Sequence, residues 1–174
     1  MLADILITLL LVLLNGFFVA AEFALVKVRS SQLDIKIQKG SKRAKMAKSL
    51  IERLDTYLSA AQLGITLASL ALGWIGERVV AAMVISAFNK FGTSLDVETI
   101  HGISIPVAFT LITFMHITFG EQIPKMMGIQ FPLETTLIIS WPLRIFYFIF
   151  GPFILLLNKS SNLSDLEGVK SSTK

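Results

Sequence analysis

Cysteine is missing from this sequence of 174 residues, so neither a disulfide nor a thiolate metal site can form. Charged residues are also scarce, at 16% of the chain, whereas a soluble domain of this length carries about a quarter. No pairing of a nucleophile with a base and no motif for an organic cofactor occurs, so we do not expect an enzyme. Hydrophobic residues make up 53% of the chain. This composition favours a membrane protein.

Four apolar stretches occupy most of the chain, at residues 5–26, 57–76, 103–120 and 135–157. About 20 apolar residues are enough for a helix to cross the hydrocarbon core of a bilayer. The first stretch is too long for a signal peptide, and Asp4 is the only charged side chain before it. We therefore expect a retained first span in an all-α membrane protein.

The stretch at 135–157 differs from the others because Pro142 and Pro152 divide it. Proline in a helix interior removes one hydrogen bond and kinks or breaks the helix. Two short helices that re-enter the membrane or lie at its surface fit better than a full crossing. The sequence thus predicts three transmembrane helices and a proline-broken re-entrant or interfacial pair. A fourth span remains the alternative.

Basic residues are concentrated between the first two spans. Residues 27–55 hold nine of them against three acids: Lys27, Arg29, Lys36, Lys39, Lys42, Arg43, Lys45, Lys48 and Arg53. Residues 77–102 hold only Arg78 and Lys90. The positive-inside rule then places the N-terminus outside and the C-terminus in the cytoplasm of a cell (inner or plasma) membrane. Because topology explains the positive charge, we expect no nucleic-acid partner.

The basic stretch also contains an amphipathic pattern. Apolar residues recur at three- and four-residue spacing: Ala44, Ala47, Leu50, Ile51 and Leu54. This predicts a cytoplasmic helix, separated from a shorter one by Gly40 and Ser41. It lies on anionic headgroups, packs beneath the membrane domain against a partner domain, or does both. After this membrane domain, at residues 1–158, the polar residues 159–174 are predicted to form a disordered tail.

The most informative polar motif is FGEQIPK, at residues 119–125. A charge at bilayer depth costs about 2.5 to 3.5 kcal/mol on insertion scales, so it persists mainly where it lines a pathway or is paired. Gly120 and Pro124 flank Glu121 and favour a broken helix with free carbonyl oxygens. Lys125 offers a simple ion pair as the alternative. His116 extends the polar path or bonds to a neighbouring helix.

Neutral polar residues lie in the first two spans. Asn15 is deep in the first, and Ser59, Gln62 and Thr66 follow one helical stripe of the second. Oxygen atoms that face a carboxylate are the ligands that Mg²⁺ prefers. Hydrogen bonds between packed helices are the alternative role for these side chains. With Glu121, the predicted metal ligands are Asn15, Ser59 and Thr66.

Three motifs together resemble the transmembrane domain of the cyclin M/CorC family, also known as hemolysin-like proteins. They are NGFFVAAEFAL at 15–25, QLG at 62–64, and FGE at 119–121 followed by Pro124 and Lys125. The resemblance implies a homodimer with three spans per chain and Na⁺-linked export of Mg²⁺. It also implies cytoplasmic CBS domains that bind ATP in the full-length protein. These domains are absent here, so this chain has no ATP site.

The resemblance matches Glu121 to the acidic ligand of the family and Ser59 to a serine of the second span. The chain departs from the family pattern at Val19, Ala21 and Ile65, where relatives often have side chains that carry oxygen. Our leading hypothesis is a divalent-cation transporter in the lipid bilayer, with Mg²⁺ carried and Na⁺ as the coupling ion. A non-transporting membrane scaffold that acts on cytoplasmic partners is the alternative.

Overall fold

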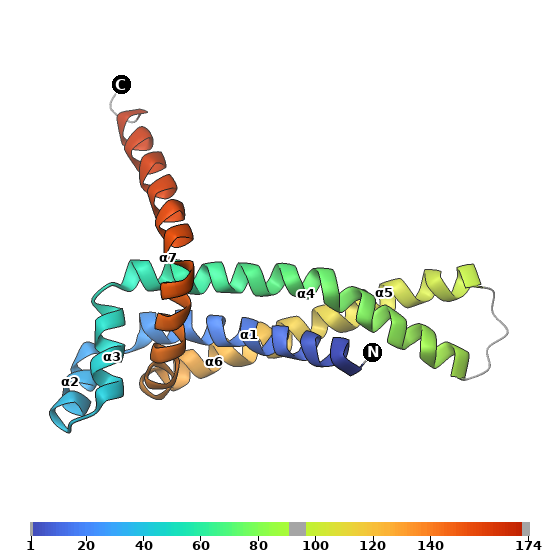
Figure 1. Ribbon diagram of the computed structural model, residues 1–174, viewed down its shortest axis with the longest axis horizontal. Helices are drawn as coiled ribbons and strands as arrows, with labels where there is room; N and C mark the ends of the chain where they lie inside the picture. Colours follow the sequence, from blue (N-terminus) through green and yellow to red (C-terminus); the bar gives the residue numbers. More distant parts are fainter. Residues whose placement is uncertain (1, 91–96, 172–174) are drawn as a thin grey trace. The chain divides into compact units, whose positions relative to one another are not determined.

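The structure is a computed structural model that describes residues 2–90 and 97–171, with the side chains of 2–76, 78–80, 82–83, 85–87 and 102–156. All regular structure in these ranges is helical, which confirms the predicted all-α class. The elements are α1 (Leu2–Lys27), α2 (Ser30–Gln38), α3 (Lys42–Ile51), α4 (Leu54–Lys90), α5 (Val97–Met115), the π-helix η1 (His116–Gln122), α6 (Ile123–Gln130) and α7 (Pro132–Ser171) (Figure 1).

Several segments are long and apolar enough to cross a bilayer, which confirms a membrane protein. Within the described residues there are four, at Leu2–Lys27, Leu54–Ala87, Gly102–Gln130 and Pro132–Leu156. Their surfaces carry large apolar side chains that would be unfavourable in water. Leu10, Phe114 and Phe148, for example, are 62%, 65% and 86% exposed. Lipid contact accounts for such surfaces because hydrocarbon solvates them.

The chain forms two compact units, which are described in turn. The first contains residues 1–19 and 64–126, and the second contains residues 20–63 and 127–174. In the first unit, α4 runs in the opposite direction to α1 and α5 (Figure 1). A buried cluster of Val12, Leu72 and Ile112 joins these three helices. The polar residues of the site described below belong to this unit.

Gly64 allows α1 and α4 to approach closely in the first unit. A Cβ atom at this position would lie 2.4 Å from the ring of Phe18. That ring is only 2% exposed and has little room to move. Only glycine fits here, as expected where small residues mediate contact between membrane helices.

The second unit contains the predicted amphipathic helix, which is confirmed as α3. Gly40 adopts a positive φ of 81° after α2, and the Ser41 hydroxyl accepts a hydrogen bond from the Ala44 amide at 3.2 Å. These two residues end one helix and cap the next. The apolar face of α3 is buried in a cluster with α2 and α7: Val28, Leu33, Ala44 and Ala47, with Ile37, Ile51, Leu133 and Leu137 packed around it. This face therefore packs on helices of the same unit, and the place of α3 at the membrane surface stays a prediction.

An ion pair also joins α2 and α3. Lys48 donates a hydrogen bond to the Asp34 carboxylate. This bond raises the pKa of Lys48 above its ordinary value. Because the pKa of Lys48 is raised in the folded protein, the ion pair stabilises the fold fully at any pH below the ordinary lysine pKa. This stability is lost only as pH rises through the raised pKa. The link between α2 and α3 therefore holds throughout the neutral range.

Helix α7 differs from the prediction at 135–157. Pro142 and Pro152 both lie inside one continuous helix, so the predicted division into two helices is wrong. Each proline removes a single hydrogen bond, and the other bonds of the helix hold, so the chain bends instead of breaking (Figure 1).

Residues 159–171 are also helical, where a disordered tail is predicted, because adding a turn to an existing helix needs no new nucleus. Residues 172–174 of that tail lie outside the described part.

The first part of α7 packs against α3 and the beginning of α4. Its first two turns pack on α3, and Arg144 Nη1 lies 3.0 Å from the Met46 sulfur of that helix. The Tyr147 ring lies 5.2 Å from the ring of Tyr57, at the beginning of α4. By length and composition, Pro132–Leu156 is also able to cross a bilayer. The re-entrant helix and the fourth span therefore both remain predictions.

Single cysteines introduced at Ser41 and at Ser171 test whether α7 crosses the membrane. Each would be the only thiol in the protein, because the chain has no cysteine of its own. If α7 does not cross, a membrane-impermeant maleimide should label both positions from the same side of the membrane. Labelling in intact and permeabilised vesicles measures the side. Reaction of the two cysteines from opposite sides would show that α7 is a fourth span.

Candidate cation site

The site begins where the helix that follows α5 widens. In η1, the Ile123 amide donates to the Thr118 carbonyl five residues earlier, which is the π-helical pattern. In an α-helix, the Gly120 carbonyl would receive the N–H of the residue four positions on, but that residue is Pro124, which has none. The sequence predicts a broken helix here. The structure instead has a continuous π-helix, and the Gly120 carbonyl turns to a partner on another helix.

That partner is Asn15 of α1, which is fully buried. Its side-chain Nδ2 donates to the Gly120 carbonyl at 3.0 Å. The two helices can approach closely here because the residue after Asn15 in α1 is Gly16. A Cβ atom on Gly16 would lie 2.8 Å from Pro124 Cγ and 3.1 Å from the Phe119 carbonyl. The NG pair of the first motif therefore provides both the polar group and the space that it needs.

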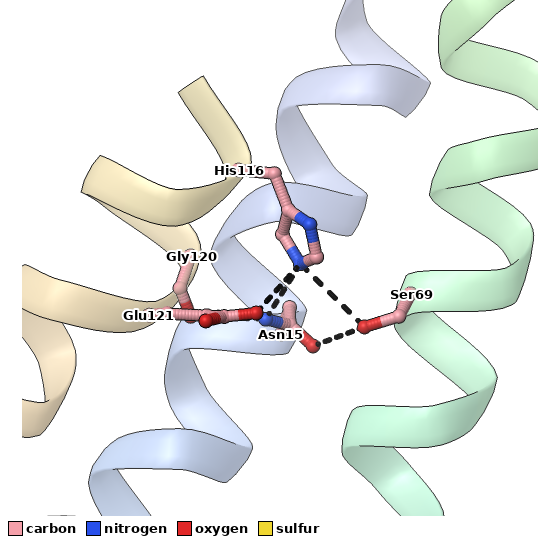
Figure 2. Close-up of polar contacts among 5 residues, drawn as sticks. All are labelled: Asn15, Ser69, His116, Gly120 and Glu121. Atoms are coloured by element: carbon pink, nitrogen blue, oxygen red, sulfur yellow. Dashed lines mark hydrogen bonds and ion pairs between the residues drawn. The ribbon is translucent and has the colours of Figure 1, made fainter. Parts of the chain in front are cut away.

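Three helices contribute to the polar cluster around Asn15 (Figure 2). Ser69 of α4 donates its hydroxyl to Asn15 Oδ1 at 3.1 Å. His116 of η1 places its Nε2 atom 3.0 Å from Asn15 Nδ2 and 3.5 Å from the Ser69 hydroxyl. The same nitrogen lies 3.7 Å from Oε1 of Glu121. The cluster thus gathers an amide, a hydroxyl, an imidazole and a carboxylate.

The hydrogen bonds assign the state of the imidazole. A carbonyl oxygen only accepts, so the Asn15 atom that faces Gly120 is the amide nitrogen. The same nitrogen also faces His116 Nε2, which must therefore be the accepting nitrogen of a neutral ring. The proton is then on Nδ1, and the Nε2 lone pair points into the cluster.

A cavity of about 200 Å³ reaches the cluster between α4 and α5. Its walls are Ser69, Leu72, Gly73, Phe109, Ile112, Thr113 and His116. Since a water molecule takes up about 30 Å³ of liquid, this space holds a few waters or a partly hydrated ion. Ser69 and His116 belong both to this lining and to the cluster. The cavity therefore adjoins the polar groups.

The predicted ligands divide between the two units. Asn15 and Glu121 both contact His116, so the structure brings them to one cluster. Ser59 belongs to the second unit, where its hydroxyl donates to the Asp55 carbonyl of its own helix at 2.9 Å. Thr66 belongs to the first unit and is exposed. Both remain predictions as ligands.

Two further members of the cluster were not predicted as ligands. The hydroxyl comes from Ser69, which continues the stripe 59, 62, 66 at the same spacing, so a signal was present. His116 was predicted only to extend the polar path or to bond to a neighbouring helix, and a bond to Asn15 of α1 is present. It stands five residues before Glu121. In an α-helix, five residues place two side chains roughly 140° apart around the axis. The π-helical turn brings them to one side.

The fold and the cluster define a helical membrane protein with a partly buried polar site between three helices. The sequence pattern of the cyclin M transmembrane N-terminal domain matches residues 6–173. The chain therefore belongs to the cyclin M transmembrane domain family.

Bacterial relatives are similar over most of this chain. It is 46% identical over 153 residues to UPF0053 protein YhdT of Bacillus subtilis, which covers 88% of this chain and 33% of the relative. UPF0053 protein YrkA of the same organism is 43% identical over 158 residues, which covers 91% of this chain and 36% of the relative. Uncharacterized protein Rv1841c of Mycobacterium tuberculosis is 31% identical over 161 residues, with 92% and 45% covered. The chain thus spans about a third of the length of the two Bacillus relatives.

Gly120 is the position where an added methyl group tests the cluster. A Cβ atom there would lie 2.8 Å from His116 Cδ2 and 3.3 Å from Asn15 Nδ2. We expect Gly120→Ala to displace the imidazole and to lower the free energy of unfolding by about 1–3 kcal/mol, the usual effect of overpacking. Thermal unfolding in detergent measures this change.

Gly73→Ala is the matched control, because a Cβ atom at Gly73 meets no atom within 4 Å. It should leave stability unchanged or raise it by up to about 1 kcal/mol, as alanine favours helix. Equal stability of the two variants would mean that the Gly120 contact is not tight in the protein.

Proposed function

We propose that this protein carries a divalent cation across the membrane through the cluster of Asn15, Ser69, His116, Gly120 and Glu121, with Mg²⁺ as the first expected cargo. The observation that supports it best is the convergence of a carboxylate, a buried amide and a freed carbonyl at a π-helical turn. Such turns are frequent at functional sites. A carboxylate inside a span is also rare unless it serves a pathway or a pair.

The spacing of the donor atoms suits one ion. A six-coordinate Mg²⁺ with bonds of about 2.1 Å holds adjacent ligand atoms roughly 3.0 Å apart and opposite ones roughly 4.2 Å apart. Here Ser69 Oγ and Asn15 Oδ1 are 3.1 Å apart, and Glu121 Oε1 is 3.7 Å from His116 Nε2. Small side-chain movements are enough to surround an ion, and water from the cavity completes its shell.

Charge supports the same assignment. In the cluster, Glu121 is the side chain that supplies a full negative charge, and it is 46% exposed. A second copy of the chain would shield this group from lipid, and the family resemblance points to a homodimer. Gly102, where a Cβ atom would meet no atom within 4 Å, offers a helix surface for close contact. We therefore propose a homodimer whose polar cluster opens alternately to the two sides.

The remaining features of transport follow from the family resemblance. We propose Na⁺-linked export of Mg²⁺ from the cytoplasm, with the N-terminus outside and the basic helices α2 and α3 inside. Cytoplasmic CBS domains in a longer chain would regulate it, since this chain spans about a third of its Bacillus relatives. The alternative is a scaffold that binds partners through its cytoplasmic helices and moves no ion.

Flux in reconstituted vesicles separates these functions. Glu121→Gln keeps the size of the side chain and removes its charge, so Mg²⁺ flux driven by a Na⁺ gradient should fall at least tenfold, in line with the loss of a charged ligand. Glu134→Gln, at an exposed position in the first turn of α7, is the matched control and should retain wild-type flux. Undiminished flux in the Glu121 variant, or no flux in the wild type, would contradict the proposal.

A further inference from the structure

We propose that a phospholipid whose headgroup carries a primary ammonium, of the phosphatidylethanolamine class, binds between the beginning of α1 and the later part of α4. These two helices line a cavity of about 650 Å³ in the first unit. Ligand pockets in proteins measure about 300–1,000 Å³, so the space is large enough for part of a lipid molecule. The residues that line it are Asp4, Trp74, Ile75, Arg78, Val79 and Ala82.

The cavity lies toward one end of the spans. Asn15 is halfway along α1 (Leu2–Lys27), and Asp4 precedes it by eleven residues. Arg78 follows Ser69, which bonds to Asn15, by nine residues in the antiparallel α4. At 1.5 Å per residue these steps rise about 14–17 Å, and half of the hydrocarbon core is about 15 Å. Asp4 and Arg78 are therefore at the depth where lipid headgroups meet the acyl chains.

Two opposite charges stand on an otherwise apolar lining. The planar guanidinium of Arg78 presents a fork of N–H donors that matches a phosphate group. The carboxylate of Asp4 only accepts hydrogen bonds, and a primary ammonium has N–H groups to donate. Ethanolamine phosphate joins these two groups through a short two-carbon linker. One headgroup can thus contact both charges while an acyl chain covers the apolar wall.

Trp74 provides an exposed aromatic wall beside the arginine. The side chain is 73% exposed, and Arg78 Cζ lies 5.8 Å from the centre of its ring. This cation–π contact holds the guanidinium against the ring. Tryptophan is also the residue type that gathers where membrane meets water, because its ring is apolar and its N–H is a donor. The pair of side chains therefore offers one surface to a phosphate and another to a hydrocarbon chain.

The two charges predict which headgroup binds best. Phosphatidylcholine has the phosphate, but its methylated ammonium has no N–H to donate to Asp4. Phosphatidylglycerol has no ammonium, and its negative charge is repelled by the Asp4 carboxylate. Phosphatidylethanolamine should therefore bind more tightly than either.

Quenching of tryptophan fluorescence by brominated acyl chains tests this order. The chain has two tryptophans, so Trp141→Phe leaves Trp74 as the only one. The protein in micelles of an uncharged maltoside detergent is titrated with each of the three phospholipids in brominated form. Half-maximal quenching should need about threefold less phosphatidylethanolamine than phosphatidylcholine or phosphatidylglycerol, as expected for one exposed ion pair.

Two substitutions in the Trp141→Phe background separate the charges. Asp4→Asn should make the phosphatidylethanolamine and phosphatidylcholine titrations equal. Arg78→Gln should raise the half-maximal fraction of all three lipids about threefold. Glu134→Gln and Arg29→Gln are the matched controls, because both residues are exposed and belong to the second unit. These two variants should keep the original titrations.

Two results would overturn the proposal. Equal half-maximal fractions for the three headgroups would show that Trp74 meets lipid as any exposed residue of a span does. Fluorescence that none of the lipids quenches would show that protein, such as a second copy of the chain, covers the cavity.

Should Trp141→Phe not fold, native mass spectrometry of the wild type decides. After transfer from mixed micelles, the chain should retain one phosphatidylethanolamine in preference to the other two phospholipids. Equal retention of the three would contradict the proposal.

Discussion

The hydrogen bond from the buried Asn15 amide to the Gly120 carbonyl is the interaction on which the rest of the site depends. An amide buried without a partner costs about 2–7 kcal/mol, so Asn15 requires partners wherever α1 is placed. Gly16 gives α1 access to η1, and Pro124 removes the α-helical partner of that carbonyl. The π-helical turn then presents the carbonyl to α1. Local sequence chemistry on two helices thus specifies how they meet.

The same network suggests how an ion would be exchanged. Asn15 Oδ1 accepts from Ser69, and His116 Nε2 accepts from Asn15. Both acceptors are lone pairs that a cation can take over once their donors turn away. Binding would then replace hydrogen bonds by metal bonds and pull on α1, α4 and η1 together. In the proposed transporter, this exchange links occupancy of the site to movement of the helices.

The helices and the site residues were predictable from the sequence to different degrees. The spans, the amphipathic helix α3 and the functional candidates Asn15 and Glu121 follow from periodicity and from polar residues in apolar runs. The continuity of α7 does not follow from the sequence. A proline removes one hydrogen bond, and packing on α3 determines whether the helix continues past it. The sequence predicts His116 only as part of the polar path or as a bond to a neighbouring helix. Its closeness to Glu121 is not predictable, since α-helical spacing separates the two side chains and the π-helical turn aligns them. Ser69 is predictable as a member of the site, because it continues the stripe of Ser59, Gln62 and Thr66 by one more step.

The position of a bound ion tests the central claim most directly. Crystals of the protein soaked in Mn²⁺ and measured at its absorption edge would locate the ion by anomalous scattering. The account predicts one strong peak in each chain, within about 2.0–2.2 Å of Glu121 and Asn15 oxygens and of His116 Nε2. A peak outside this cluster, or an intact Asn15–Gly120 network with no peak at saturating Mn²⁺, would contradict it.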